Sequence, residues 1–195
     1  HPQLVFILPD AKKNLFDRWK THSPFQHRKL IAIDLDDDVL AAVRELCPME
    51  IIDLRDTDPE GWSEDVRPAL TGANQIAIYE MHYRDMTAHL SAGSAHPGKY
   101  LGMAERGTKS PDGLATGLDH LVELGVSHVH LLPTADFGSI DETVENNTQY
   151  NWGYDPVNFN VPEGSYSTNA AKGEIRISEM KIDARDQLKG NIGKL

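Results

Sequence analysis

The sequence predicts an α/β fold with parallel strands, and three observations between residues 75 and 133 carry this prediction. The segment QIAIYEMHYRD (75–85) holds an apolar run with β-branched and aromatic residues, which is typical of a buried strand. An amphipathic segment follows, and VSHVHLLP (126–133) is a second apolar run. A strand, a helix, a glycine turn and a second strand make a βαβ unit, whose two strands are parallel.

The helix of this unit is predicted from Ser110 to Leu124. Ser110 is suited to capping, Pro111 to the first helical position, and Gly125 to the left-handed residue after the last turn. Its apolar face consists of Leu114, Leu118, Leu121, Val122 and Leu124. Pro133 is predicted to end the second strand.

The N-terminal part is less defined. Residues 1–49 predict a short α/β segment of uncertain fold, with apolar runs at 4–8 and 30–35 and helical patterns at 12–20 and 39–46. Residues 50–73 read as a connector rich in turn formers and acidic residues, with a possible short strand at 51–54. We therefore divide the chain into a segment 1–49, a connector 50–73, and a domain beginning at residue 74 and extending to residue 195.

Composition excludes several classes of function. The formal net charge of −11 argues against nucleic acid, whose phosphates require clusters of lysine and arginine, whereas neutral carbohydrate is compatible with an acidic surface. No apolar run approaches the roughly 20 residues of a membrane span, so we expect a soluble chain. The compartment stays open between the bacterial cytoplasm and export by a signal that this sequence does not carry. The single cysteine, Cys47, excludes an internal disulfide.

Residues 135–168 predict a long loop at the carboxyl end of the second strand, a position where long loops are usually functional. Its second half, YNWGYDPVNFNVPEGSYST (150–168), is rich in aromatic and amide side chains. Aromatic planes suit the C–H faces of sugar rings, and amides suit their hydroxyl groups. The residue types alone leave a packed loop open as the alternative.

The heptad YNWGYDP (150–156) resembles the diagnostic sequence of type I pullulanases in the α-amylase family. IYEMHYRDMT (78–87) is similar to their first barrel strand, GLDHLVELGVSHVHLLPTADF (117–137) to their first helix and second strand, and VPEGSYST (161–168) to their onward loop. The resemblance covers roughly residues 51–181.

The resemblance implies that the domain from residue 74 is the N-terminal part of a TIM (β/α)8 barrel. It also implies a retaining starch-debranching glycoside hydrolase that cleaves α-1,6-glucosidic bonds. The expected partners are α-glucan polysaccharides or oligosaccharides such as pullulan, branched starch and glycogen. No cofactor is expected, although a structural calcium ion is possible in the family.

The same resemblance assigns substrate-binding residues to the heptad. Tyr154 would stack on the glucose at the cleavage subsite, and Asp155 would hold that sugar or its neighbouring side chains. Asn151 and Trp152 would shape the loop, and Gly153 would permit its backbone turn.

Several residues near the strands are assigned supporting or structural roles. Tyr79, His82 and Arg84 lie on or just after the first strand and are expected to support the site. His128 and His130 alternate onto one face of the second strand and so could mimic a metal site. We favour packing for this pair, because no third ligand is evident.

No catalytic residue is assigned. A retaining glycosidase needs two carboxylates about 5 Å apart, and the family takes them from later strands. Glu80, Asp85, Asp136 and Glu163 are acids in the matching part, but no motif singles them out as catalytic. We therefore expect the chain to be a fragment that lacks the catalytic carboxylates and is inactive alone.

Two alternatives remain. KLIAIDLDDDVL (29–40) resembles the first motif of haloacid dehalogenase-like phosphatases, which would make Asp34 the nucleophile and Asp36 the general acid beside Mg²⁺. Asp38 stands where threonine or valine is usual, and the later motifs are not identifiable. The second alternative is a noncatalytic α-glucan-binding fragment, which would keep Tyr154 but not turnover.

Overall fold

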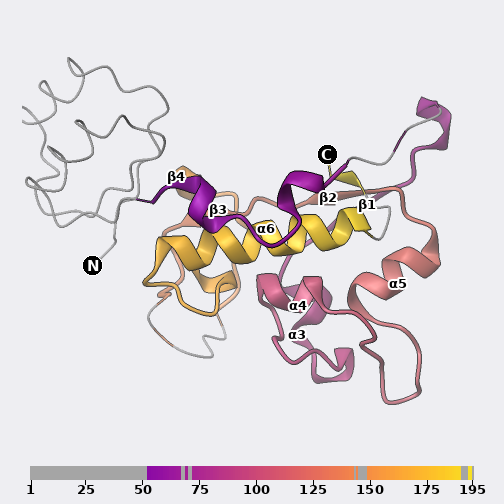
Figure 1. Cartoon of the computed structure of the whole chain (residues 1–195). Coiled ribbons are helices and arrows are strands. Elements are labelled where there is room, and N and C mark those ends of the chain that lie inside the picture. The colour runs from indigo at the N-terminus through magenta and orange to yellow at the C-terminus, as the bar shows by residue number, and fades with distance from the viewer. Residues whose placement is uncertain are drawn as a thin grey trace, which may run out of the picture.

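The computed structural model describes residues 52–66, 69, 72–142, 144, 149–189 and 193–194 (Figure 1). The elements predicted within residues 1–49 lie outside these ranges, as does the Asp34 and Asp36 motif. The described part mixes helices and strands, as the sequence predicts.

A parallel sheet contains β1 (Ile78–Met81), β2 (His128–Leu131) and β5 (Gly193–Lys194), in the order β1-β2-β5. β1 and β2 pair from Ile78↔His128 to Met81↔Leu131, and β5 pairs with β2 on its other side, also in parallel. Helix α5 (Gly117–Leu124) lies between β1 and β2 in the sequence. The predicted βαβ unit is therefore confirmed.

The predicted start of the helix at Ser110 is wrong, because residues 109–115 form a tight turn before α5 begins. Lys109 and Ala115 form an isolated antiparallel bridge, and the Ser110 backbone N–H donates to the Leu114 carbonyl at 2.8 Å. Gly113 supplies the left-handed turn residue at φ 81°. The predicted end is confirmed: Gly125 has φ 78°, and its N–H donates to carbonyls of the last helical turn.

The segment predicted as a loop over residues 135–168 contains strands. β3 (Ala135–Phe137) and β4 (Pro156–Pro162) form an antiparallel two-stranded sheet, followed by the 3-10 helix η5 (Gly164–Tyr166). The register shifts twice along β3, so the pairing is irregular. The sequence of β4 does alternate, since Val157, Phe159 and Val161 are separated by asparagines. However, its prolines and asparagines are residue types that are depleted in strands and favour loops.

The connector forms 3-10 helices: η1 (Leu54–Thr57), η2 (Trp62–Glu64) and η3 (Ala73–Gln75). The short strand predicted at 51–54 is wrong in its described part, because Leu54 begins η1. Lys181 ties η1 to the long helix α6 (Gly173–Lys189): its Nζ donates to the Leu54 carbonyl at 2.6 Å and to Thr57 Oγ1 at 2.8 Å.

The remaining short helices are α3 (Asp85–Ala88), η4 (Leu90–Ala92) and α4 (Tyr100–Ala104). Across the described ranges, none of the helices combines the length and apolar character that crossing a membrane requires.

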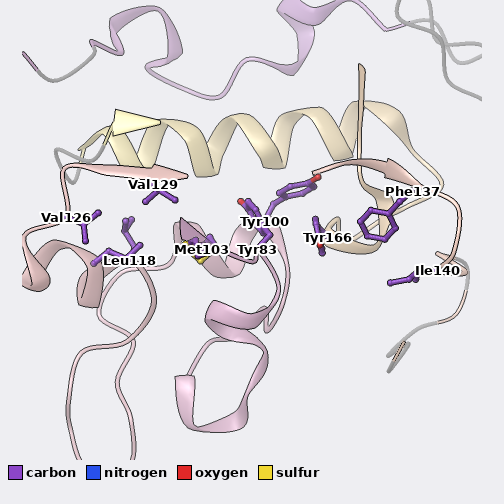
Figure 2. Packing of buried hydrophobic residues seen from close by; sticks show 11 residues of the cluster. Tyr83, Tyr100, Met103, Leu118, Val126, Val129, Phe137, Ile140 and Tyr166 are labelled. Atoms are coloured by element: carbon purple, nitrogen blue, oxygen red, sulfur yellow. The ribbon is translucent and has the colours of Figure 1, made fainter. Parts of the chain in front are cut away.

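The core is a row of buried apolar side chains that runs alongside helix α6 (Figure 2). Its centre is aromatic. The rings of Tyr83 and Tyr166 stack with centroids 5.3 Å apart, and Tyr100 meets both rings edge-on. The hydroxyl of Tyr100 donates to the Glu163 carbonyl at 3.1 Å. This cluster joins the segment after β1, helix α4 and the segment after β4, so it fixes the base on which the loop between β3 and β4 stands.

Candidate functional site

The heptad 150–156 lies at the base of the loop between β3 and β4. The ladder of this hairpin reaches Phe137↔Pro156, so Asp155 immediately precedes β4, and Ser139 follows β3 by two residues. The two arms of the loop come together at Ser139 and Asp155, and we call this place the neck of the loop. The last turn of the heptad is formed at the neck.

Three side chains form a closed triangle across the neck. Ser139 Oγ donates to Asp155 Oδ2 at 2.7 Å, and Asn151 Nδ2 donates to Asp155 Oδ1 at 2.8 Å. Asn151 Nδ2 also donates to Ser139 Oγ. Hydrogen bonds from Ser139 and then from Asn151 lower the pKa of the Asp155 carboxyl. Both oxygens of Asp155 are therefore held by protein groups.

Gly153 lets the backbone turn sharply. Its φ is 87°, and its N–H donates to Asn151 Oδ1 at 2.7 Å. A Cβ added at this position would lie 2.2 Å from the Pro133 carbonyl oxygen. The turn thus needs glycine both for its left-handed conformation and for the close approach of the segment after β2.

His82, just after β1, holds the other side of the heptad. Its Nε2 lies 2.7 Å from the Asn151 carbonyl oxygen and 3.2 Å from Tyr166 Oη. Its ring packs against the Tyr150 ring, with centroids 4.8 Å apart. The Tyr150 hydroxyl donates to Asp85 Oδ2 at 2.9 Å. His82 is buried, so the segment after β1 supports this loop from beneath.

The aromatic side chains carried by this anchored turn face outward. Tyr154 is 67% exposed and Trp152 is 62% exposed. Large apolar groups of this kind are usually buried, so two exposed rings on a backbone held by side-chain hydrogen bonds form a surface suited to a flat apolar partner.

No protein-family model matches the chain. Individual known proteins, however, are similar to it. The pullulanase of Bacillus subtilis is 40% identical over 124 residues, which are 64% of this chain and 17% of that protein. A chloroplastic isoamylase of Zea mays is 34% identical over 119 residues, 60% of this chain and 14% of that protein. Among solved structures, a Paenibacillus barengoltzii pullulanase complexed with maltotetraose is 46% identical, with a TM-score of 0.72 over 74% of this chain and 23% of that one.

The chain is related to pullulanases and isoamylases. It spans about one sixth of the length of the B. subtilis pullulanase and about one quarter of the P. barengoltzii chain. These matches do not favour the phosphatase alternative, because pullulanases and isoamylases are starch-debranching glycoside hydrolases.

The supporting residues that the pullulanase resemblance assigns lie in different places. Tyr79 is half-buried against the core cluster, away from the turn. His82 contacts the heptad directly, as described above. Arg84 lines a separate cavity of about 220 Å³ together with Gly98, Lys99 and other residues. His82 contacts residues 150–156 through a hydrogen bond and a ring contact, and Arg84 interacts electrostatically with Tyr150.

The two histidines of β2 have unlike surroundings. His128 is buried, and its Nδ1 lies 2.9 Å from Ser127 Oγ. His130 is exposed, and its Nδ1 lies 3.0 Å from Glu80 Oε2 on β1. Within the described ranges, neither belongs to a group of three ligands placed to hold a metal ion.

Three carboxylates gather beneath the hairpin: Asp136, Glu142 and Glu163. One oxygen of each lies within 4.8 Å of the others, a spacing that can hold a cation. However, the guanidinium of Arg176, from α6, donates to Asp136 Oδ1 at 3.0 Å and to Glu142 Oε1 at 3.1 Å. An arginine already neutralises this cluster, so its donors fit an internal ion-pair network better than a calcium ion.

The network perturbs its own acids. Burial, and then a hydrogen bond with Asp136, raises the pKa of Glu142 to about 8, although Arg176 opposes the shift. Burial also raises the pKa of Glu163, which accepts hydrogen bonds from the N–H groups of Phe137 and Ser165 at 2.9 and 2.8 Å.

Sequence reasoning missed Ser139, Glu142 and Arg176. No motif marks a lone serine two residues after a strand. The sequence signal for Arg176 is only an arginine in a polar segment, where a solvated position is the usual expectation.

Proposed function

We propose that this chain supplies the substrate-binding start of a pullulanase-type catalytic domain, with an α-glucan as its ligand. Tyr154 would stack on a glucose ring, and Trp152 would border the same sugar chain. The observation that carries the proposal is the exposure of these two rings on a turn that Gly153 and the side chains of Asn151 and Asp155 hold in place.

The parallel strands support the finer fold proposal. We infer that the domain from residue 74 to residue 195 is the first part of a (β/α)8 barrel, after a segment 1–49 and a connector 50–73. β1, β2 and β5 lie side by side in parallel, which is the arrangement that such a barrel repeats. The heptad follows β2 at its carboxyl end, where the loops of these barrels form the site.

The proposed ligand follows from the chemistry of the turn and from solved relatives. The P. barengoltzii pullulanase structures hold maltotetraose in one case and maltohexaose with α-cyclodextrin in another. The proposed substrates of the whole enzyme are pullulan, branched starch and glycogen, cleaved at α-1,6 bonds with retention.

Asp155 is proposed to act on the protein rather than on the sugar. Ser139 and Asn151 donate hydrogen bonds to its two carboxylate oxygens. These bonds favour the expectation that Asp155 holds neighbouring side chains over the expectation that it holds the sugar. We assign no catalytic residue. Asp85, an acid beside the heptad, accepts the Tyr150 hydroxyl at 2.9 Å.

Binding of maltotetraose to the 195-residue chain, measured by isothermal titration calorimetry, tests the proposal. We expect wild type to bind and Tyr154→Ala to weaken binding roughly two- to twelvefold, because an aromatic stacking contact contributes about 0.5–1.5 kcal/mol. Phe159→Ala is the matched control, since Phe159 is an exposed aromatic residue of β4 outside the heptad, at 77% exposure. Equal binding by wild type and Tyr154→Ala would remove Tyr154 from the site.

Hydrolysis is tested separately. We propose that these 195 residues bind α-glucan without cleaving it, because the pair of carboxylates that retaining hydrolysis requires is not assigned among them. The expected result is no release of reducing sugar from pullulan. Saturable release by the purified chain would refute this part of the proposal and would leave α-glucan as the ligand.

A further inference from the structure

Ser139 lies where the two arms of the loop between β3 and β4 come together. The hairpin ladder stops at Phe137↔Pro156, and just beyond it the hydrogen bond from Ser139 Oγ to Asp155 Oδ2 joins the two arms at 2.7 Å. Closing a loop at its neck restricts the conformations of the adjoining backbone, including the turn that carries Tyr154.

The hydroxyl of Ser139 acts as both donor and acceptor. It donates to Asp155 and accepts from Asn151 Nδ2, while Asn151 Nδ2 also donates to Asp155 Oδ1. The side-chain oxygen of Asn151, Oδ1, accepts a hydrogen bond from the Gly153 N–H at 2.7 Å. A continuous set of hydrogen bonds therefore runs from Ser139, through Asn151, to the residue directly before Tyr154.

We propose that Ser139 is a positioning residue for α-glucan binding, whose hydroxyl closes the neck of the loop and orients the turn that presents Tyr154. This role rests on the proposed function, since it takes Tyr154 to be the residue that meets the sugar. Ser139 does not itself touch the ligand in this proposal.

The chemistry at this position requires a small hydroxyl group. An alanine would leave Asp155 Oδ2 and Asn151 Nδ2 each without one partner, whereas a threonine would keep the donor and the acceptor. Because Ser139 is the first cause of the lowered pKa of Asp155, that carboxyl reports directly on whether the bond is present in solution.

The test compares Ser139→Ala, Ser139→Thr and wild type in the full 195-residue chain. Ser91→Ala is the matched control, since Ser91 hydrogen-bonds only locally, to His89 Nδ1 at 2.7 Å. Two properties are measured by NMR: the pKa of the Asp155 carboxyl, and the line widths and shifts of the Tyr154 ring. The dissociation constant for maltotetraose is measured by calorimetry.

We expect Ser139→Ala to raise the pKa of Asp155 toward its ordinary value and to change the Tyr154 ring signals. It should also raise the dissociation constant roughly two- to tenfold, the effect of losing one hydrogen bond that orders the binding turn. Ser139→Thr should restore all three readouts, and Ser91→Ala should leave them unchanged.

Two outcomes overturn the proposal. If Ser139→Ala leaves the Asp155 pKa unchanged, the bond does not form in solution. If the pKa rises while the Tyr154 signals stay as in wild type, the bond does not orient the turn. Failure of the proposed function is distinguishable from both, because a wild-type chain that does not bind maltotetraose still reports on Ser139 through the Asp155 and Tyr154 signals.

Discussion

Glu142 makes the stability of this chain depend on pH in a defined direction. In the folded chain, burial and then the neighbouring Asp136 carboxyl raise its pKa from 4.5 to about 8. Glu142 therefore keeps its proton at neutral pH when folded and loses it when unfolded. The variant Glu142→Gln carries a permanently neutral group of the same shape, whose amide can still donate to Asp136 and accept from Arg176.

The sign of the effect follows from proton binding in the two states. Below pH 4.5 both states are protonated, so Glu142 adds no dependence on pH. Between pH 4.5 and about 8 the folded state binds one proton more, so the free energy of unfolding falls as pH rises, by up to about 1.4 kcal/mol per pH unit. Above about pH 8 both states are ionised, and the loss stays constant.

Urea unfolding of wild type and Glu142→Gln at pH values from 5 to 9 measures this contribution. We expect the variant to gain stability relative to wild type as pH rises to about 8, and then to keep a constant advantage. Taking the difference between the two proteins cancels the titration of all other groups that the substitution does not touch. Glu123→Gln removes an exposed carboxylate from α5 and controls for the loss of one negative charge. A difference that is the same at pH 5 and pH 8, or that shrinks with pH, would refute the reasoning.

Two further substitutions test the supports of the site by urea unfolding. Gly153→Ala should destabilise the fold more than Gly107→Ala: both glycines have positive φ, which costs about 1–2 kcal/mol for alanine, but only at Gly153 would the new Cβ meet another backbone atom, the Pro133 oxygen at 2.2 Å. Equal losses would show that the segment after β2 does not press on the turn. Arg176→Met should cost about 3–5 kcal/mol, because it leaves buried carboxylates without their cation, whereas Arg106→Met breaks an exposed pair and should cost at most about 1 kcal/mol. A loss at Arg176 no larger than at Arg106 would mean that the network is not ionised as described.

The sequence predicts the parts of the fold that local patterns specify. The βαβ unit is confirmed because its strands are apolar runs and Gly125 marks the helix end by its left-handed conformation. The start of α5 is wrong because Ser110 and Pro111 satisfy the rules for a helix start equally well in a turn, and only the pairing of Lys109 with Ala115 distinguishes the two.

The candidate site is predictable only where a motif carries it. Residues 150–156 were identified by resemblance, and Gly153 has the backbone turn that the resemblance implies. The assignments of Tyr154, Trp152, Asn151 and Asp155 as substrate-binding residues stay predictions. The hydrogen bonds of Ser139 could not be predicted, because they depend on a hairpin whose register is irregular and whose first strand, β3, is too short to show a periodic pattern.

The hydrogen bonds around the heptad hold the proposed binding turn in place without any assigned catalytic carboxylate. The turn is fastened on two sides, by His82 from the end of β1 and by Ser139 across the hairpin neck. Beneath the same hairpin, Arg176 joins β3 to helix α6 through Asp136. Each of these anchors lies within residues 82–176, so the geometry of the turn that carries Tyr154 is set locally. This is why we expect substitutions at Ser139 and Gly153 to alter α-glucan binding in the 195-residue chain itself.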